Sequence, residues 1–357
     1  MKKALKSQEH IYLLLEKTAG QKTTQIAQAL NISRVSVYLH LKQLILENRV
    51  YSIGRASATR YFPVSRELPT QEVLALIQKA LFEKYEENIP SEEIIETFRR
   101  SMMYMDKDGI ISYGLDAFLL WCYDEKHNYT NIIPEKAVEY IDIIGSIEYL
   151  RGKNGLLDVT IPARENLGED MNIGFNKFFI CTVSVLQNGF GSTRTALSLR
   201  YGKQNSNIEL LRDAISLWIQ PIRTFVYKNK IDAVIFTPPT EGRKMQFRDV
   251  LERELNLSIS KIIVEKVSLS GRVLESQKNI RDKKRRIYNA LGSMIVTLPV
   301  NLKTLEHILI LDDSFTTGAT PNAIALKMRE GGFIGKITII TICGSMNYDL
   351  AITEDEI

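Results

Sequence analysis

The spacing of hydrophobic residues changes along the chain, and each change marks a segment. Through residue 64 apolar side chains recur at helical intervals, and residues 65–155 continue at helical spacing. From residue 156 short apolar runs, such as Ile308–Leu311, alternate with amphipathic stretches, which is the pattern of a parallel sheet covered by helices. We therefore predict an α/β protein in three parts: a small N-terminal domain over 1–64, a helical linker or dimerisation region over 65–155, and a parallel-sheet domain over 156–357.

The first 64 residues predict three helices followed by two short strands. The helices are expected over 9–17, 23–30 and 33–47, and the strands over 50–53 and 60–63. In the third helix the spacing of Val37, Leu41 and Leu44 places them on one buried face. The polar and basic side chains that we expect on its outward face are Ser33, Arg34, Ser36, Tyr38 and His40. Arg55 and Arg60 are expected near the tip of the strand pair.

The charge of the chain is concentrated in this N-terminal domain. Residues 1–64 contain ten Lys and Arg against three Glu, a net charge of +7, whereas the whole chain carries +4. A basic face of this kind suits a polyanion. The element order and the outward face resemble a winged helix-turn-helix of bacterial regulators. The resemblance implies that the domain binds double-stranded DNA as a homodimer on paired half-sites. A helical bundle that contacts other proteins is the alternative.

The predicted sheet domain contains several strand-like segments before its most informative motif. We expect strands over 156–161, 178–186, 196–201 and 233–236, and one amphipathic helix over 207–227.

The motif is the run Ile308–Thr320, ILILDDSFTTGAT. Four apolar residues predict a buried strand, Asp312 and Asp313 follow it, and Pro321 opens a predicted helix over 321–329. A turn that leads into a helix N-terminus directs backbone N–H groups and the helix dipole at one point. The sequence therefore predicts a phosphate site beside two carboxylates, which suits a ligand that carries a phosphate together with a diol or a metal ion.

This run resembles the phosphoribosyl pyrophosphate (PRPP) motif of type I phosphoribosyltransferases: four hydrophobic residues, two acids, two variable positions and Thr-Thr-Gly-x-Thr. The resemblance implies that Asp312 and Asp313 hold the ribose hydroxyls. It also implies that the 5′-phosphate is bound by Thr316, Thr317, Gly318, Ala319 and Thr320. Magnesium would then be held mainly through PRPP, with no direct protein ligand.

Two further segments are similar to those of ComF-like phosphoribosyltransferases. The Pro-Pro turn after the strand 233–236 leads to Arg243 and Lys244, which the resemblance assigns to the pyrophosphate together with Arg248. A charged segment over 267–289 carries Gln277, Ile280 and Arg285 at the spacing of a loop that closes over the leaving group, whereas Asn289 is one position out of register. A solvated basic turn and an unused surface loop are the respective alternatives.

Composition and cysteine usage fit a cytoplasmic protein with no membrane segment. The three cysteines lie far apart, with neither metal-ligand spacing nor an even disulfide framework. The longest apolar stretch is broken by Thr182 and Ser184 and is too short to cross a bilayer.

Taken with both resemblances, the sequence favours a DNA-binding protein that transfers a phosphoribosyl group from PRPP to a nucleobase or related acceptor and releases pyrophosphate. Magnesium is the expected cofactor. One alternative is a catalytically silent, PRPP-sensing transcriptional regulator. Another is a ribosyltransferase and DNA-binding effector of a phage-defence system of the retron type.

Overall fold

The computed structural model describes residues 2–18, 20–46, 49–53, 59–63, 70–106, 109–124, 132–168, 171–239, 246–266, 289–300 and 302–345. The chain divides into two compact units, Met1–Gly145 and Ser146–Ile357. The division falls ten residues before the expected start of the sheet domain at 156, and it keeps 1–64 and 65–145 in one unit. The protein is mixed α/β, as expected.

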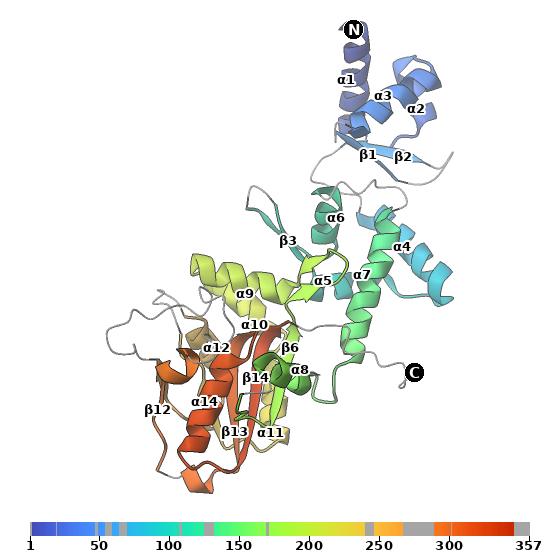
Figure 1. Cartoon of the computed structure of the whole chain (residues 1–357). Coiled ribbons are helices and arrows are strands. Elements are labelled where there is room, and N and C mark those ends of the chain that lie inside the picture. The colour runs from blue at the N-terminus through green and yellow to red at the C-terminus, as the bar shows by residue number, and fades with distance from the viewer. Residues whose placement is uncertain are drawn as a thin grey trace. The chain divides into compact units, whose positions relative to one another are not determined.

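The N-terminal part of the first unit folds around one small core. Figure 1 shows its helices and strands. Its elements are α1 (Lys2–Lys17), α2 (Thr23–Leu30), α3 (Arg34–Leu46), β1 (Val50–Ile53) and β2 (Arg60–Pro63). The strands pair antiparallel, with Val50 opposite Pro63. The predicted inner stripe of α3 is confirmed, because Val37, Leu41 and Leu44 are buried against α1 and α2.

The rest of the first unit is largely helical, as predicted. Its elements are α4 (Thr70–Tyr85), α5 (Ser91–Ser101), β3 (Met103–Met105), β4 (Ile111–Tyr113), α6 (Gly114–Asp124) and α7 (Ile132–Tyr149), whose last residues belong to the second unit. Phe98, Phe118 and Tyr140 form an aromatic cluster, and the Tyr140 hydroxyl donates a 2.8 Å hydrogen bond to Ser101 Oγ. This region therefore has a packed interior of its own.

The second unit is built on a six-stranded sheet with the order β10-β9-β13-β14-β6-β5. All neighbours pair in parallel except β5, which runs antiparallel to β6. The strands are β5 (Leu157–Asp158), β6 (Lys177–Val183), β9 (Ala233–Phe236), β10 (Ser260–Lys261), β13 (His307–Phe315) and β14 (Lys336–Gly344). Every residue of Ile308–Leu311 is buried, as required of a strand covered on both faces.

Helices and short hairpins complete this unit (Figure 1). The helices are α8 (Thr160–Leu167), α9 (Arg194–Asn205), α10 (Ile208–Ser216), α11 (Ile219–Lys228), α12 (Phe247–Leu255) and α14 (Ala319–Glu330), with the 3-10 turn η2 (Leu302–Thr304). The hairpins are β7 (Val185–Leu186) with β8 (Gly191–Ser192), and β11 (Val264–Lys266) with β12 (Met294–Val296). One core joins α10, α11 and α12 to β13 and β14 through Leu211, Phe225, Leu251, Leu309 and Ile340.

Five predicted elements of this unit differ from the structure. The strand predicted over 156–161 is limited to Leu157–Asp158, because α8 begins at Thr160. The strand predicted over 178–186 is divided at Ser184 into β6 and β7. The strand predicted over 196–201 is wrong, because these residues lie in α9. The helix predicted over 207–227 is broken at Leu217 and Trp218 into α10 and α11. The strand predicted over 308–311 continues through both acids to Phe315, because its pairing with β14 extends to Gly344.

No helix in the described part of the chain is long and apolar enough to cross a membrane.

Candidate functional site

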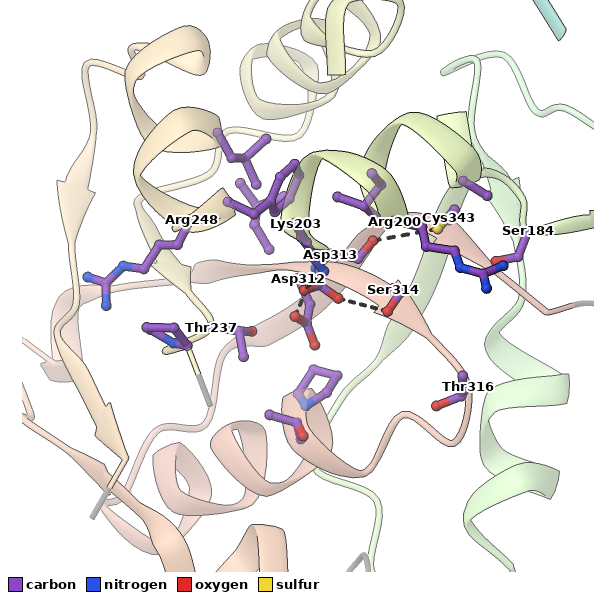
Figure 2. A pocket seen from close by; sticks show the side chains of 18 of the residues that line it. Ser184, Arg200, Lys203, Thr237, Arg248, Asp312, Asp313, Ser314, Thr316 and Cys343 are labelled. Carbon is purple, nitrogen blue, oxygen red and sulfur yellow. Dashed lines mark hydrogen bonds and ion pairs between the residues drawn. The ribbon is translucent and has the colours of Figure 1, made fainter. Parts of the chain in front are cut away.

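A cleft of about 600 Å³ opens at the carboxyl ends of the parallel strands of the second unit. β9 contributes Phe236, β13 contributes Asp312 and Asp313, and β14 contributes Cys343. Carboxyl ends of parallel strands meet at one edge of the sheet, which is where open α/β sheets bind ligands. Helices α9 and α12 and the start of α14 supply the remaining walls (Figure 2).

Asp313 is held by donors from three directions. Lys203 of α9 forms an ion pair with Asp313 Oδ2, and the Ser314 hydroxyl donates a 2.7 Å hydrogen bond to Asp313 Oδ1. The Cys343 thiol lies 3.8 Å from the backbone carbonyl oxygen of Asp313 and donates to it. Figure 2 shows Lys203 descending from α9 onto this carboxylate. Lys203 and Ser314 thereby fix the side chain near the carboxyl end of β13, and Cys343 holds the backbone.

Asp312 has a different environment from its neighbour. Its Oδ1 accepts a 2.8 Å hydrogen bond from the backbone N–H of Asp313. Burial, and then the Asp313 carboxylate beside it, raise the pKa of Asp312 to about 7. The cations of Lys203 and Lys266 oppose this rise. Asp312 therefore changes its charge near neutral pH.

The predicted phosphate turn lies at the start of α14. Gly318 has φ 72° and caps the helix, and the Thr317 hydroxyl oxygen accepts a 3.3 Å hydrogen bond from the Ala319 N–H. A β-carbon on Gly318 would lie 3.2 Å from Phe178 Cε2, so glycine suits both the backbone angle and the available space. The first N–H groups of a helix have no acceptor within it. The turn therefore presents donors and the positive end of the helix dipole to the cleft.

Buried polar contacts fix the start of α14 against the segment before β6. The Asn322 side-chain oxygen accepts a 2.9 Å hydrogen bond from the Gly174 N–H, and its nitrogen donates to the Asn172 carbonyl at 3.0 Å. Asn322 is buried. The donor-bearing end of the helix is thus held in place by a segment about 150 residues away in sequence.

The wall of the cleft formed by β9 and α12 contains two polar atoms that lack hydrogen-bond partners among the described residues. Thr237 follows β9, and Arg248 lies in the first turn of α12. Among the residues that the structure describes, Thr237 Oγ1 and Arg248 Nε are buried and have no hydrogen-bond partner. Buried polar groups are normally satisfied, so this wall suits a ligand that accepts hydrogen bonds. Of the three cations proposed for pyrophosphate, Arg248 lines the cleft, whereas Arg243 and Lys244 lie outside the described residues.

Helix α9 brings two cleft residues that the sequence interpretation missed, Arg200 and Lys203. Buried polar contacts position the helix: the Ser198 hydroxyl donates to Asp213 Oδ2 at 2.6 Å, and Arg194 forms an ion pair with the same carboxylate. Gly202 packs closely on Leu211 of α10. The two residues were missed because a strand was predicted over 196–201. The helical spacing of Ala196, Leu199 and Lys203 is the signal that could have identified them.

The residues expected to bind DNA differ in their exposure in the first unit. Ser33, which precedes α3, is exposed, as are Arg34 and Tyr38 on α3 and Arg60 on β2. Ser36 and His40 are half-buried, so they face outward less than predicted, while Val35 and Leu39 are exposed in their place. The Ser33 hydroxyl oxygen accepts a 3.1 Å hydrogen bond from the Ser36 N–H and so caps the helix.

The remaining predicted site residues, Arg55, Gln277 and Arg285, lie outside the described residues, so their predictions stay untested.

Comparison with protein-family models and with curated proteins finds no relative of this chain: no family model matches it, and no curated protein matches it.

Proposed function

We propose that the second unit binds PRPP with magnesium and transfers its phosphoribosyl group to a nitrogen acceptor, and that the N-terminal part of the first unit binds duplex DNA. The observation that carries the transferase proposal is the meeting of two adjacent carboxylates with the donor-rich start of α14 in one cleft.

The sugar phosphate fits the side of the cleft formed by β13 and α14. The carboxylates of Asp312 and Asp313 would accept hydrogen bonds from the ribose hydroxyls. The turn 316–320 would bind the 5′-phosphate through backbone N–H groups and threonine hydroxyls. The two carboxylates and the phosphate-binding turn are only a few residues apart in the sequence. One strand and the turn after it therefore supply both sets of groups.

The pyrophosphate fits the wall formed by β9 and α12. Arg248 and Thr237 would donate to its oxygens, which would satisfy the two buried atoms that lack partners among the described residues. The start of α12 adds the positive end of a helix dipole on the same side. Arg243 and Lys244 are proposed for the same role from their positions in the sequence.

Magnesium fits this site as a partner of the substrate. The described residues hold no group of three or more His, Cys, Asp or Glu side chains that could coordinate a metal ion. Magnesium keeps several waters and commonly binds through substrate phosphates, so a dedicated protein cage is not needed. When bound, the ion would neutralise negative charge that develops on the pyrophosphate as it leaves.

In the proposed transfer, the bond between ribose C1 and the pyrophosphate oxygen breaks and a bond from C1 to the acceptor nitrogen forms. The electron pair leaves with the pyrophosphate, and the proton of the acceptor nitrogen passes to the released pyrophosphate. Arg248 would stabilise the leaving charge, and the carboxylates would stabilise the cationic sugar. The protein contributes position and charge, and no covalent nucleophile is required.

The test is a calorimetric titration of the full chain with PRPP and magnesium. The double variant Asp312→Asn with Asp313→Asn is expected to lose binding, because neutral amides replace both carboxylates while side-chain size is nearly conserved. Equal binding by the wild type and the double variant would refute the proposed site. Release of pyrophosphate across a panel of nucleobases, with and without DNA, then tests catalysis.

One observation favours a second function, a PRPP sensor without catalysis. The aromatic rings among the described cleft residues, Phe236 and Phe247, both lie on the side of β9 and α12. Helix α9 itself contributes no aromatic ring to the described part of the cleft, and the Phe247 ring is faced by the ammonium of Lys203 on α9. Tight PRPP binding with no pyrophosphate release under any condition would favour the sensor.

A further inference from the structure

Helix α3 has an uncovered apolar stripe opposite its buried one. The side chains of Val35, Tyr38 and Leu39 are 71%, 57% and 59% exposed. Residues three and four apart lie on one helical face, so these three side chains form one continuous surface. On the other face Val37 and Leu41 are buried in the core. The helix is therefore apolar on two sides, and only one of them has a partner among the described residues.

The charges around the stripe indicate what it contacts. Arg34 and Lys42 are exposed at its two ends, and α3 contains no acidic residue. Residues 1–64 carry a net charge of +7. An apolar strip between cations, on a basic domain, is complementary to a polyanion that also offers apolar groups. Duplex DNA has that combination in its major groove, because thymine places a methyl group between the phosphate strands.

The position of the stripe along the helix suits such a contact. The Ser33 cap starts the helix, so Val35, Tyr38 and Leu39 lie in its first two turns. In helix-turn-helix proteins the N-terminal part of the recognition helix contacts base edges. Side chains without hydrogen-bonding groups, such as Val35 and Leu39, contact bases through the thymine methyl.

We infer that Val35, Tyr38 and Leu39 read thymine methyl groups in the major groove, while Arg34 and Lys42 contact phosphates. The inference rests on the proposed DNA binding and adds the chemical class of base that is recognised. It implies a binding site that contains A·T pairs at the positions facing the stripe.

The experiment begins by selecting bound duplexes from a random library with the full-length protein. Each selected thymine is then replaced by uracil, which removes only the methyl group and keeps every hydrogen-bonding atom. Replacement at a contacted position is expected to weaken binding about threefold to fivefold, the effect of losing one buried methyl group. Thymines elsewhere in the duplex serve as internal controls.

Protein variants connect the effect to the stripe. Leu39→Ala is expected to bind thymine and uracil duplexes alike at the position that it contacts. Leu13→Ala is the matched control, because Leu13 is also an exposed leucine of the same unit, 44% exposed on α1, and it should retain the difference. Arg34→Ala should weaken both duplexes equally and lower the salt dependence by about one phosphate contact. Circular dichroism melts show whether each variant is folded.

The outcomes separate the inference from the proposal beneath it. Absence of binding to any duplex would refute DNA binding itself. Selective binding that ignores the uracil replacement, or a selected site without thymine, would overturn only the methyl-reading role. If Leu39→Ala instead dissociates an oligomer in sedimentation and leaves DNA affinity unchanged, the stripe binds a second copy of the chain and the inference is also overturned.

Discussion

Asp312 and Asp313 are adjacent in sequence and have opposite electrostatic surroundings. The negative charge of Asp313 is compensated by Lys203, whereas the half-buried Asp312 lies beside a second carboxylate and its pKa is raised to about 7. In the proposed site a partly protonated Asp312 can donate or accept a hydrogen bond with a ribose hydroxyl. Two identical side chains are therefore expected to respond differently to substitution.

The raised pKa of Asp312 predicts how stability depends on pH. A carboxyl group with a higher pKa in the folded state binds protons more tightly there, so its contribution to stability falls as pH rises from about 4 to about 7. Replacing it by Asn removes this loss. Asp312→Asn is therefore expected to raise the free energy of unfolding at pH 8 by on the order of 1 kcal/mol or more, with a smaller effect near pH 4.

Urea denaturation at both pH values measures this difference. Asp313→Asn is the matched comparison and should gain less stability at pH 8, because it relieves the same repulsion but removes the carboxylate that pairs with the largely buried Lys203. A destabilised Asp312→Asn at pH 8 would contradict the prediction.

Lys203 lies outside the PRPP motif, and its position in the cleft predicts a contribution to PRPP binding. Its ammonium group orients Asp313 and lies 5.4 Å from the centre of the Phe247 ring, so it adds positive charge to the cleft. Lys203→Met is expected to weaken PRPP binding about tenfold, roughly 1.4 kcal/mol, and Lys203→Arg should restore most of the loss. Calorimetry measures both variants. Lys261→Met, which removes a surface ion pair to Glu252 in the same unit, should bind normally; equal losses in Lys261→Met and Lys203→Met would exclude a specific role.

At the scale of elements, the connection between β13 and α14 depends on one glycine. Gly318 combines a positive φ with close packing on Phe178. Gly318→Ala is expected to cost about 1 kcal/mol for the backbone angle and more for the contact, and to displace the threonine turn. PRPP binding should fall at least tenfold, as measured by calorimetry.

Gly332→Ala is the control for this substitution. Gly332 also has a positive φ, 92°, but a β-carbon there would meet no atom within 4 Å. It should lose stability through the backbone angle alone and retain PRPP affinity. Equal binding by both alanine variants would show that the threonine turn tolerates the change.

Sequence reasoning succeeded where an element and its chemistry are contiguous. The strand that carries the acids, the turn and the helix start are contiguous over residues 307–330, so local pattern was sufficient to find them, although it ended the strand before the acids. It failed over 196–201, where Ala196, Ser198 and Arg200 alternate with Leu197, Leu199 and Tyr201 as in a strand. The structure has a helix there, because Leu199 and Gly202 pack on α10 and Ser198 bonds to Asp213. Tertiary packing outweighed a short local pattern.

At the scale of the whole molecule, each compact unit contains one of the two tryptophans. Trp121 is buried in the first unit, and Trp218 lies in the second unit, where its ring contacts the Arg151 guanidinium at 4.7 Å. Each tryptophan can therefore report the unfolding of one unit. The variants Trp121→Phe and Trp218→Phe each leave one reporter.

PRPP with magnesium is expected to raise the melting temperature reported by Trp218 and to leave that reported by Trp121 unchanged. A ligand at 100 times its Kd stabilises the state that binds it by about 2.7 kcal/mol. Fluorescence-detected melts of the two variants, with and without PRPP, measure the difference. Equal shifts in both would show that the two units unfold together.

The sequence by itself determined the α/β class, the inner stripe of α3 and the order of strand, acids, turn and helix around Asp312, because each depends on residues close together in the chain. Only the tertiary structure decided that residues 194–205 form a helix, that Lys203 meets Asp313 across 110 residues, and that Thr237 and Arg248 share their cleft. Those contacts arise from the pairing of parallel strands in one sheet and the packing of helices on its faces. Their energies act between segments that no local pattern relates.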